Sequence, residues 1–464
     1  MSAPAPLERH PDRLLPADPG VRAIARRLHA EVDGAPIVSP HGHVDPRMLL
    51  ADRPFPDPAT LFVAPDHYVT RMLHASGVGL DRVHGAEPRE LWRIFCTRWH
   101  LFDGTPSGYW IADALSGVFG VEVLPSEGSA DELYDELSAR LAEPEFRPRA
   151  LFSRFGIRFL ATTDDPLDEL DAHLALRGIL PGTVAPTFRP DAYLDPLRAD
   201  WAEAVERLAA WSGSSASDAD GLLDALAARR RHFRDRGAVS TDHGPAQPVT
   251  LRLDAAERAR LHARCLDGAA DPAERAAYAA GLLYEMARMS VDDGLVMTIH
   301  PGIVRDHHAP TRAAFGPDTG HDIPRPTSFV EGLRPMLTDF GVDERFRVVL
   351  FTVDESTFSR ELAPLAGFYP TVFVGAPWWF LDAPDAMRRF REATIETAGF
   401  SRYSGFVDDT RAFCSIPARH DAARRVDAGV LARLVAEHRL DEDRAREILV
   451  DSVDAQPRRV FRIS

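Results

Sequence analysis

Residues 36–45 of the chain read Pro-Ile-Val-Ser-Pro-His-Gly-His-Val-Asp, a short apolar run that ends at His41 and His43. We predict a buried β-strand here, with both histidines on one side, because side chains at positions i and i+2 of a strand project together. Two converging imidazoles supply half of the ligands of a typical zinc site. An HxH motif alone fits two surface-loop histidines equally well, since short motifs have many false matches. The other strand ends must therefore decide between these interpretations.

Seven further apolar, β-branched runs follow, and each of them ends in polar residues. They lie at residues 157–161, 183–187, 238–241, 294–299, 346–352, 371–374 and 405–407. Helical patterns alternate with these runs, which is typical of βα units and a parallel sheet. Any one run could instead belong to a buried helix. Eight in succession predict an α/β fold of the (β/α)8 TIM-barrel type, with the catalytic residues at the carboxyl ends of the strands.

The segment after the first predicted strand differs from this pattern. Residues 45–154 have helical spacing interrupted by prolines, and we interpret them as a helical cap inserted after that strand. Residues 1–464 then form a single barrel domain, a length that barrels with insertions reach. Helices are also predicted at residues 195–210 and 218–236, and the run Arg229-Arg230-Arg231 on the second is expected to form a solvated face.

The composition restricts the chemistry. The chain contains no lysine and no asparagine, so all 54 of its basic residues are arginine. Schiff-base nucleophiles, pyridoxal phosphate attachment, Walker-type phosphate loops and carbamylated lysine bridges are therefore excluded. Any site for an anion must use arginine, histidine or backbone amides.

The charge and the termini bear on partners and location. A formal net charge of −16 disfavours nucleic acid and anionic membranes as partners. We see no apolar run of the roughly 18–20 residues that span a bilayer and no signal peptide. The cysteines, Cys96, Cys265 and Cys414, are too far apart in the sequence to suggest a disulfide framework. We expect a cytoplasmic protein that binds neither nucleic acid nor membranes. The sequence does not decide between a monomer and a homo-oligomer.

Candidate ligands for a metal follow the first, fifth and eighth predicted strands. They are His41, His43, His300 and Asp409, with Asp408 as a competitor for the last position. Three protein ligands and one open position would suit one catalytic divalent ion, with Zn²⁺ expected.

A group of arginines lies on the same rim or in the predicted cap. Planar, bidentate binding of a carboxylate is one reading of these arginines, and ion pairing is an equally good one. The arginines are Arg71, Arg189, Arg305 and Arg411, and the acidic residues available to pair with them are Asp191, Asp242, Asp354 and Glu355.

Several motifs in register resemble a known family. They are His41-Gly-His43, Asp66-His67-Tyr68 with Arg71, Thr162-Thr-Asp-Asp-Pro166, Thr187-Phe-Arg-Pro-Asp191, Asp242-His-Gly244, Phe315-Gly-Pro-Asp-Thr-Gly320, Trp378-Trp-Phe380 and Asp409-Thr-Arg411 with Arg419-His420. In this order, and over nearly the full length, they resemble the uronate isomerase family of the amidohydrolase superfamily. The resemblance implies a (β/α)8 barrel that interconverts hexuronates such as glucuronate and galacturonate with their 2-keto forms.

The resemblance also implies roles for single residues. It assigns His41, His43 and His300 to the metal, and it favours Asp409 over Asp408 because the family's aspartate lies two residues before an arginine, here Arg411. His67, Tyr68 and Arg189 match positions expected to face the sugar. We also expect substrate contacts from Arg71, Arg305, Trp378, Asp242 and His243.

The expected function is a metal-dependent aldose–ketose isomerase acting on a small-molecule sugar acid. Asp409 or a metal-held hydroxide would remove the C2 proton, and the metal with Arg411 would stabilise the enediolate. Tyr68 or His67 would assist ring opening, and Arg189 would hold the substrate carboxylate. The alternative is a metal-dependent hydrolase of a lactone or amide, because the same ligands can activate water. A non-catalytic sugar-acid binder is the third hypothesis.

Two segments depart from the family pattern. Trp110-Ile111-Ala112-Asp113-Ala114-Leu115 replaces an expected Trp-Thr-His-Leu-Glu-Leu, and Arg305-Asp306-His307-His308 replaces an arginine followed by three asparagines. We therefore expect a divergent member whose preferred sugar acid differs from glucuronate and galacturonate.

Overall fold

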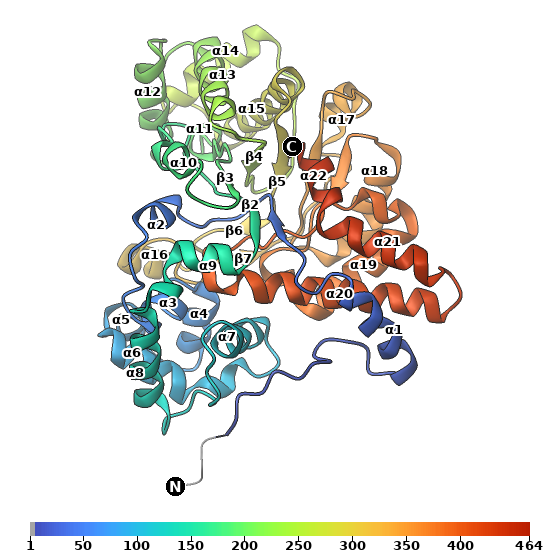
Figure 1. The fold of residues 1–464 in the computed structure, drawn as a ribbon. Helices are drawn as coiled ribbons and strands as arrows, with labels where there is room; N and C mark the ends of the chain where they lie inside the picture. The colour runs from blue at the N-terminus through green and yellow to red at the C-terminus, as the bar shows by residue number, and fades with distance from the viewer. Residues whose placement is uncertain (1–4) are drawn as a thin grey trace.

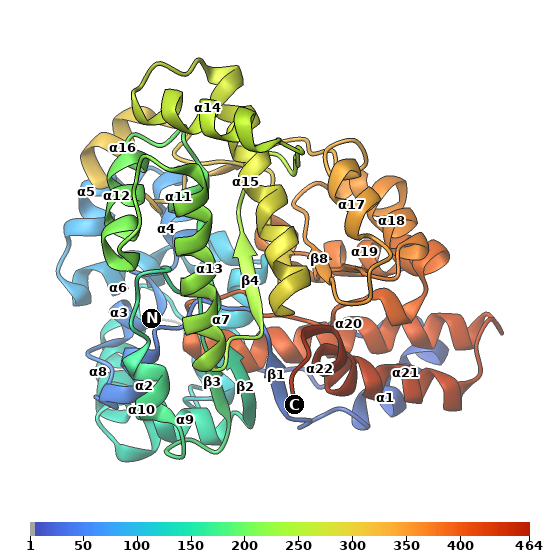
Figure 2. The ribbon, with the colours of Figure 1, turned by 90° about the horizontal axis from the view of Figure 1, so that it is seen from above.

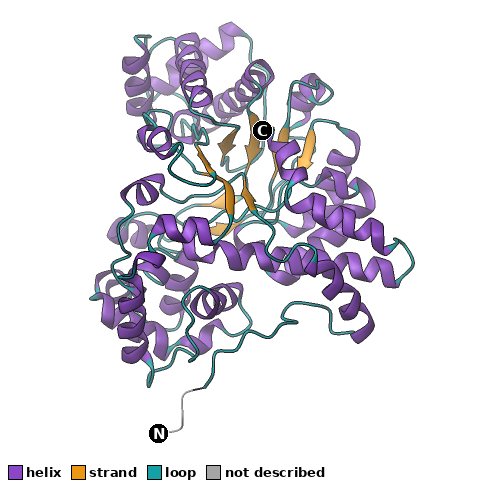
Figure 3. Cartoon of the chain, in the orientation of Figure 1, coloured by secondary structure: helices purple, strands orange, loops and turns teal. Residues whose placement is uncertain are grey.

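A ring of short parallel strands forms the centre of the molecule, and helices surround it (Figures 1 and 3). The computed structural model describes residues 5–464. One parallel sheet has the order β1 (Ile37–Ser39), β2 (Ile157–Ala161) and β3 (Thr183–Ala185); the other has the order β4 (Ser240–His243), β5 (Val296–Ile299), β8 (Val348–Leu350) and β9 (Val372–Val374). A parallel bridge between Phe188 and Thr241 joins the two sheets. Seven of the eight predicted strands and their parallel arrangement are thus confirmed.

The eighth predicted strand, at residues 405–407, is wrong as a regular strand. Gly405 has a φ of +85° and Asp409 a φ of +43°, and these left-handed conformations interrupt an extended ladder. The segment still closes the ring. Ser404 N–H donates to Val374 O at 2.9 Å on one side, and His43 N–H donates to Thr410 O at 3.0 Å on the other.

Helices cover the outside of the ring. In chain order they are α1 (Pro19–Ala30), α10 (Asp171–Leu176), α11 (Asp191–Leu194), α12 (Trp201–Ser212), α13 (Ala219–Asp235), α14 (Ala255–Leu266), α15 (Pro272–Asp293), α17 (Arg334–Phe340), α18 (Ala363–Phe368), α19 (Pro384–Ala398), α20 (Ile416–Ala436), α21 (Glu442–Val453) and α22 (Ala455–Phe461). The helix predicted from residue 195 begins only at Trp201, because the Asp195 carboxylate accepts the Leu197 N–H at 3.0 Å and forms a turn there. Among residues 5–464, no helix combines the length and apolar character needed to cross a membrane.

The arginine run on α13 is only partly solvated as predicted: Arg231 is exposed, but Arg229 and Arg230 contradict the expectation. The Arg229 and Arg230 side chains are fully buried. Arg229 donates to the carbonyl oxygens of Pro166 and Asp168, and Arg230 forms an ion pair with Asp293, Nε to Oδ2 at 2.6 Å. Burial of these guanidinium groups is tolerated because Nε and Nη2 of each arginine have acceptors, whereas Nη1 of each has no hydrogen-bond partner among residues 5–464.

The chain between β1 and β2 contains α2 (Pro46–Ala51), α3 (Pro58–Phe62), α4 (His67–Ala75), α5 (Leu80–Gly85), α6 (Pro88–Thr97), α7 (Pro106–Gly117), α8 (Ala130–Leu141) and α9 (Pro148–Arg154). Asp45, Asp57 and Asp66 cap the first helices by accepting backbone N–H groups of the first turn. The apolar side chains of the helices between β1 and β2 form one hydrophobic cluster with residues of the barrel strands, including Ile37, Ile157, Leu160 and Val184. The helices of this segment, which we interpret as a cap, therefore pack directly on the barrel.

A two-stranded hairpin leaves the barrel directly after β5 and was not predicted. Its strands are β6 (Ile303–Val304) and β7 (Ile323–Pro324), paired antiparallel. Residues 305–322 between them, here named the β6–β7 excursion, contain α16 (Ala309–Phe315). Both Figures 1 and 2 place α16 beside α5 of the cap, and the rings of Phe315 and His84 lie 5.8 Å apart.

Candidate active site

The carboxyl ends of the strands border a cavity of about 1050 Å³. Its walls come from the barrel strands, from the start of α4 and from the β6–β7 excursion. The predicted site residues that line it are His41, His43, His67, Tyr68, Arg189, Asp242, His243, His300, Arg305, Trp378, Asp409 and Arg411. Arg71 is absent from this lining: its guanidinium lies 4.9 Å above the Phe380 ring.

His41, His43 and Asp409 form one group that could hold a cation. The Asp409 Oδ1 atom lies 3.3 Å from His41 Nε2 and 2.8 Å from His43 Nε2. Burial raises the pKa of Asp409, but the two histidines lower it by more than burial raises it. The pKa of Asp409 therefore lies well below the ordinary value, and the group is a carboxylate. β1 ends at Ser39, so the histidines follow the strand and do not lie on it as predicted. Their convergence is fixed by the chain closure between His43 and Thr410.

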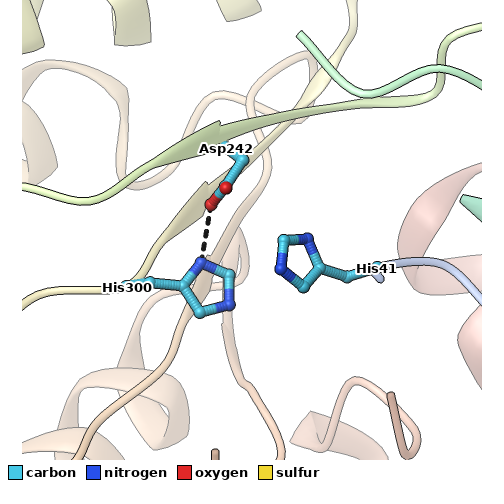
Figure 4. Close-up of side chains that lie close together, drawn as sticks. All are labelled: His41, Asp242 and His300. Carbon is cyan, nitrogen blue, oxygen red and sulfur yellow. Dashed lines mark hydrogen bonds and ion pairs between the residues drawn. The ribbon is translucent and has the colours of Figure 1, made fainter. Parts of the chain in front are cut away.

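A second group shares His41 and adds Asp242 and His300. Figure 4 shows the His300 ring joined to Asp242 by a dashed line, with the His41 ring beside the His300 ring. His300 Nδ1 lies 2.7 Å from Asp242 Oδ1, and the His41 and His300 rings stack with centroids 4.4 Å apart. Within residues 5–464, the buried Nε2 of His300 has no hydrogen-bond partner.

This donor set fits a divalent cation. Imidazole nitrogens and carboxylate oxygens are the ligands that Zn²⁺ takes in catalytic sites, and an unpartnered buried nitrogen is costly unless something binds it. Each of the two groups keeps its ligand atoms within 4.8 Å of one another. Binding of one cation by all four predicted ligands, His41, His43, His300 and Asp409, stays a prediction.

Asp408 and Asp409 have different surroundings. Asp408 is fully buried and faces His420, with Nε2 3.3 Å from its Oδ2. Its carbonyl oxygen accepts a hydrogen bond from Arg419 Nη1 at 3.4 Å. Asp409 borders the cavity and Asp408 does not. Of the two aspartates, only Asp409 is therefore placed to contact a molecule in the cavity, and its role stays a prediction.

The first two residues of α4 present the cap's chemistry to the cavity. Asp66 caps the helix by accepting the Tyr68 N–H at 2.8 Å, and this orients both side chains. The rings of His67 and Tyr68 stack with centroids 4.7 Å apart. Burial lowers the pKa of His67 and raises that of Tyr68 well above its ordinary value. Both are therefore neutral near pH 7 and able to donate or relay a proton.

Three of the four predicted arginines, Arg189, Arg305 and Arg411, have carboxylate partners in this structure. Arg71 instead lies over the Phe380 ring. Arg189 lies between Asp191 (Nε to Oδ2, 3.0 Å) and Asp242 (Nη1 to Oδ2, 3.3 Å). These acids outweigh the effect of burial and raise the pKa of Arg189. Arg305 contacts Asp322 at 3.2 Å, with its guanidinium 4.6 Å above the Trp379 ring.

Sequence reasoning missed several residues of this cavity. Trp379, Asp318, Asp322 and Arg419 line it. Arg419 lies 3.5 Å above the Trp110 ring and forms a buried ion pair with Asp382. The motifs Phe315–Gly320 and Arg419-His420 marked parts of this set, but neither motif had been given a role.

The departures from the family pattern lie mostly away from the cavity. Ala112 and Ala114 do not line it, and Ala114 is buried in the cap core. Asp113 accepts from the Arg9 guanidinium, Nε to Oδ1 at 2.6 Å. Of the loop residues 306–308, only Asp306 borders the cavity. The alanines at the cap departures therefore form no part of the cavity wall.

Comparisons with known proteins agree over the whole chain. A family model described as glucuronate isomerase matches residues 21–456. A uronate isomerase from Corynebacterium efficiens is 53% identical over 463 residues, covering 98% of each chain. The solved structure of a glucuronate isomerase from Caulobacter crescentus has 46% identity and a TM-score of 0.97, covering 99% of this chain and 98% of the other. That of a uronate isomerase from Thermotoga maritima has 29% identity and a TM-score of 0.93, covering 98% and 99%. The expectation of divergence is wrong, because a relative of 53% identity is not remote.

Proposed function

The chain belongs to the glucuronate isomerase family, which makes it an aldose–ketose isomerase of hexuronates, and from that premise we propose how its cavity residues act. The observation that carries the proposal is the group of His41, His43 and Asp409 beside Arg411. Proton transfer between C2 and C1 needs a base, a neighbouring acid and stabilisation of an enediolate. We assign the base and the stabilising charge to Asp409 and Arg411, which follow the eighth predicted strand, and the acid to Tyr68 and His67 of the cap.

We propose that His41, His43 and Asp409, with His300 beside them, hold one divalent cation, and that this cation is Zn²⁺. Bound there, the cation would polarise the carbonyl oxygen as a Lewis acid. The support is the donor set of nitrogen and oxygen ligands, in which the buried His300 Nε2 has no hydrogen-bond partner among the described residues.

The remaining roles follow from charge and position. Asp409 is ionised and borders the cavity, so its carboxylate takes the C2 proton. The Arg411 guanidinium stabilises the negative charge of the enediolate. Tyr68 and His67 are neutral and pass a proton to the ring oxygen during ring opening. Arg189 binds the substrate carboxylate through Nη2, which has no hydrogen-bond partner among the described residues.

The test is conversion of uronates in deuterated water, followed by NMR. D-Glucuronate and D-galacturonate should each give a 2-keto product, with solvent exchange at the carbon that gains the proton. An Asp408→Asn variant should keep more activity than an Asp409→Asn variant. Hydrolysis of a uronolactone without interconversion of aldose and ketose would support the hydrolase alternative instead.

A further inference from the structure

The β6–β7 excursion bridges the barrel and the cap across the cavity. Gly320 has a φ of +87°, and a Cβ added there would lie 2.6 Å from Arg71 Cβ and 3.1 Å from His67 O. The backbone of the excursion therefore packs directly on α4, the helix that carries His67 and Tyr68. The position of this loop is set from both ends, by β6 and β7 on the barrel and by α4 on the cap.

Asp318 lies in this loop and borders the cavity. Its Oδ2 accepts hydrogen bonds from Arg411 Nη1 and Nη2, at 3.4 and 3.3 Å. Both side chains are 45% exposed, and ion pairs of that exposure add little to stability. Asp318 has a φ of +60°, a left-handed conformation that aspartate tolerates better than most residues. A conformation of this kind costs free energy and occurs frequently at functional sites.

The second carboxylate oxygen of Asp318 is free. Within the described part of the chain, only Oδ2 has a hydrogen-bond partner, so Oδ1 is an available acceptor at the cavity wall. Burial raises the pKa of Asp318, but the charges of Arg411 and Arg305 lower it by a larger amount. The Asp318 carboxyl group is therefore ionised at neutral pH. An ionised carboxylate accepts hydroxyl hydrogens and repels another carboxylate.

We propose that Asp318 is a specificity-determining residue that positions Arg411 through Oδ2 and accepts a substrate hydroxyl through Oδ1. This deepens the proposed function and rests on it. The substrate carboxylate is thereby directed away from the excursion, and a polyhydroxylated acid is preferred over an apolar acid of equal charge. Part of the cavity's selectivity then comes from a loop outside the barrel strands.

Binding of acids that cannot isomerise tests this inference apart from activity. D-Gluconate has hydroxyls and a carboxylate but no carbonyl group, and hexanoate has the carboxylate alone. Quenching of tryptophan fluorescence should report both, because Trp378 and Trp379 border the cavity. Asp318→Ala should weaken gluconate binding about tenfold, the value of one charged hydrogen bond. It should leave hexanoate binding unchanged or tighter, since it removes a negative charge.

Two further variants separate this role from a structural one. Asp318→Asn keeps an acceptor oxygen and should recover part of the gluconate affinity. Asp385→Ala breaks another exposed ion pair, with Arg388, outside the cavity lining, and should leave both affinities unchanged. Gluconate affinity in Asp318→Ala that stays within twofold of wild type, or improves, overturns the inference. If wild type shows no isomerase activity but Asp318→Ala still weakens gluconate binding as predicted, the result contradicts only the isomerase function and not the role of Asp318.

Discussion

Gly42 and Asp408 approach so closely that a Cβ on Gly42 would lie 3.2 Å from Asp408 Oδ1. The same Cβ would lie 3.4 Å from Ala161 O. The glycine between the two histidines therefore allows the first strand end to meet the chain closure at Asp408 and Asp409. The HxH motif and the aspartate pair are brought together by this contact.

Gly42→Ala should consequently disturb the site. The added methyl group overpacks a buried position, which costs about 1–3 kcal/mol of unfolding free energy. It also shifts His41 and His43 relative to Asp409, so kcat should fall more than the loss of stability explains. Denaturant unfolding and turnover on D-glucuronate check both effects. Gly85→Ala is the control, because a Cβ there meets nothing within 4 Å. Wild-type kcat in Gly42→Ala would show that the close approach does not matter to the site.

Asp409→Asn should lose catalysis and keep the fold. An amide neither accepts the C2 proton nor balances the charge of a bound cation. We expect kcat to fall well beyond tenfold, which corresponds to more than about 1.4 kcal/mol of barrier. Steady-state kinetics and circular dichroism measure the two properties. Turnover within tenfold of wild type would mean that another group is the base.

Removal and return of a divalent cation should change the melting temperature. A cation at 100 times its Kd stabilises the folded state by about 2.7 kcal/mol. After treatment with a chelator, Zn²⁺ should raise the melting temperature of wild type but not of His43→Ala. His300→Ala then shows whether the second group takes part: a reduced shift places His300 at the ion, and a full shift limits the site to His41, His43 and Asp409.

Asp164 should make stability depend on pH. Burial raises its pKa to about 7, against hydrogen bonds from Thr162 and Thr187 that lower it. The folded protein thus holds a proton that the unfolded chain releases near its ordinary pKa of about 3.9. The contribution of Asp164 to the free energy of unfolding therefore falls as the pH rises from about 4 to about 7.

The Asp164→Asn variant should lack this decline. The unfolding free energy of wild type minus that of the variant, measured with denaturant at several pH values, should decrease between pH 4 and 7. Burial lowers the pKa of His173 to about 4, which has the opposite effect, but His173 is present in both proteins. Parallel profiles for the two proteins would mean that Asp164 is ionised in the fold.

The barrel was predictable because strand and helix periods recur through the sequence, and polar residues mark the strand ends. The segment at residues 405–407 looked like the other strands, but the backbone conformations at Gly405 and Asp409 depend on closure of the ring. Most of the residues named from the rim motifs border the cavity, but Arg71 does not, and the roles given to these residues stay predictions. Sequence patterns could not show that Arg229 and Arg230 are buried, because their acceptors, the Pro166 carbonyl and Asp293, are more than 60 residues away.

The hydrophobic cluster that the cap shares with β1, β2 and β3 also affects how the molecule can change. A segment with its own core can be exchanged between homologues as a module, but this cap cannot leave without exposing Ile37 and Leu160 to water. We expect the cap and the barrel to unfold in one transition. Variation in substrate preference should therefore arise through loops at the rim, where a substitution leaves that common core intact.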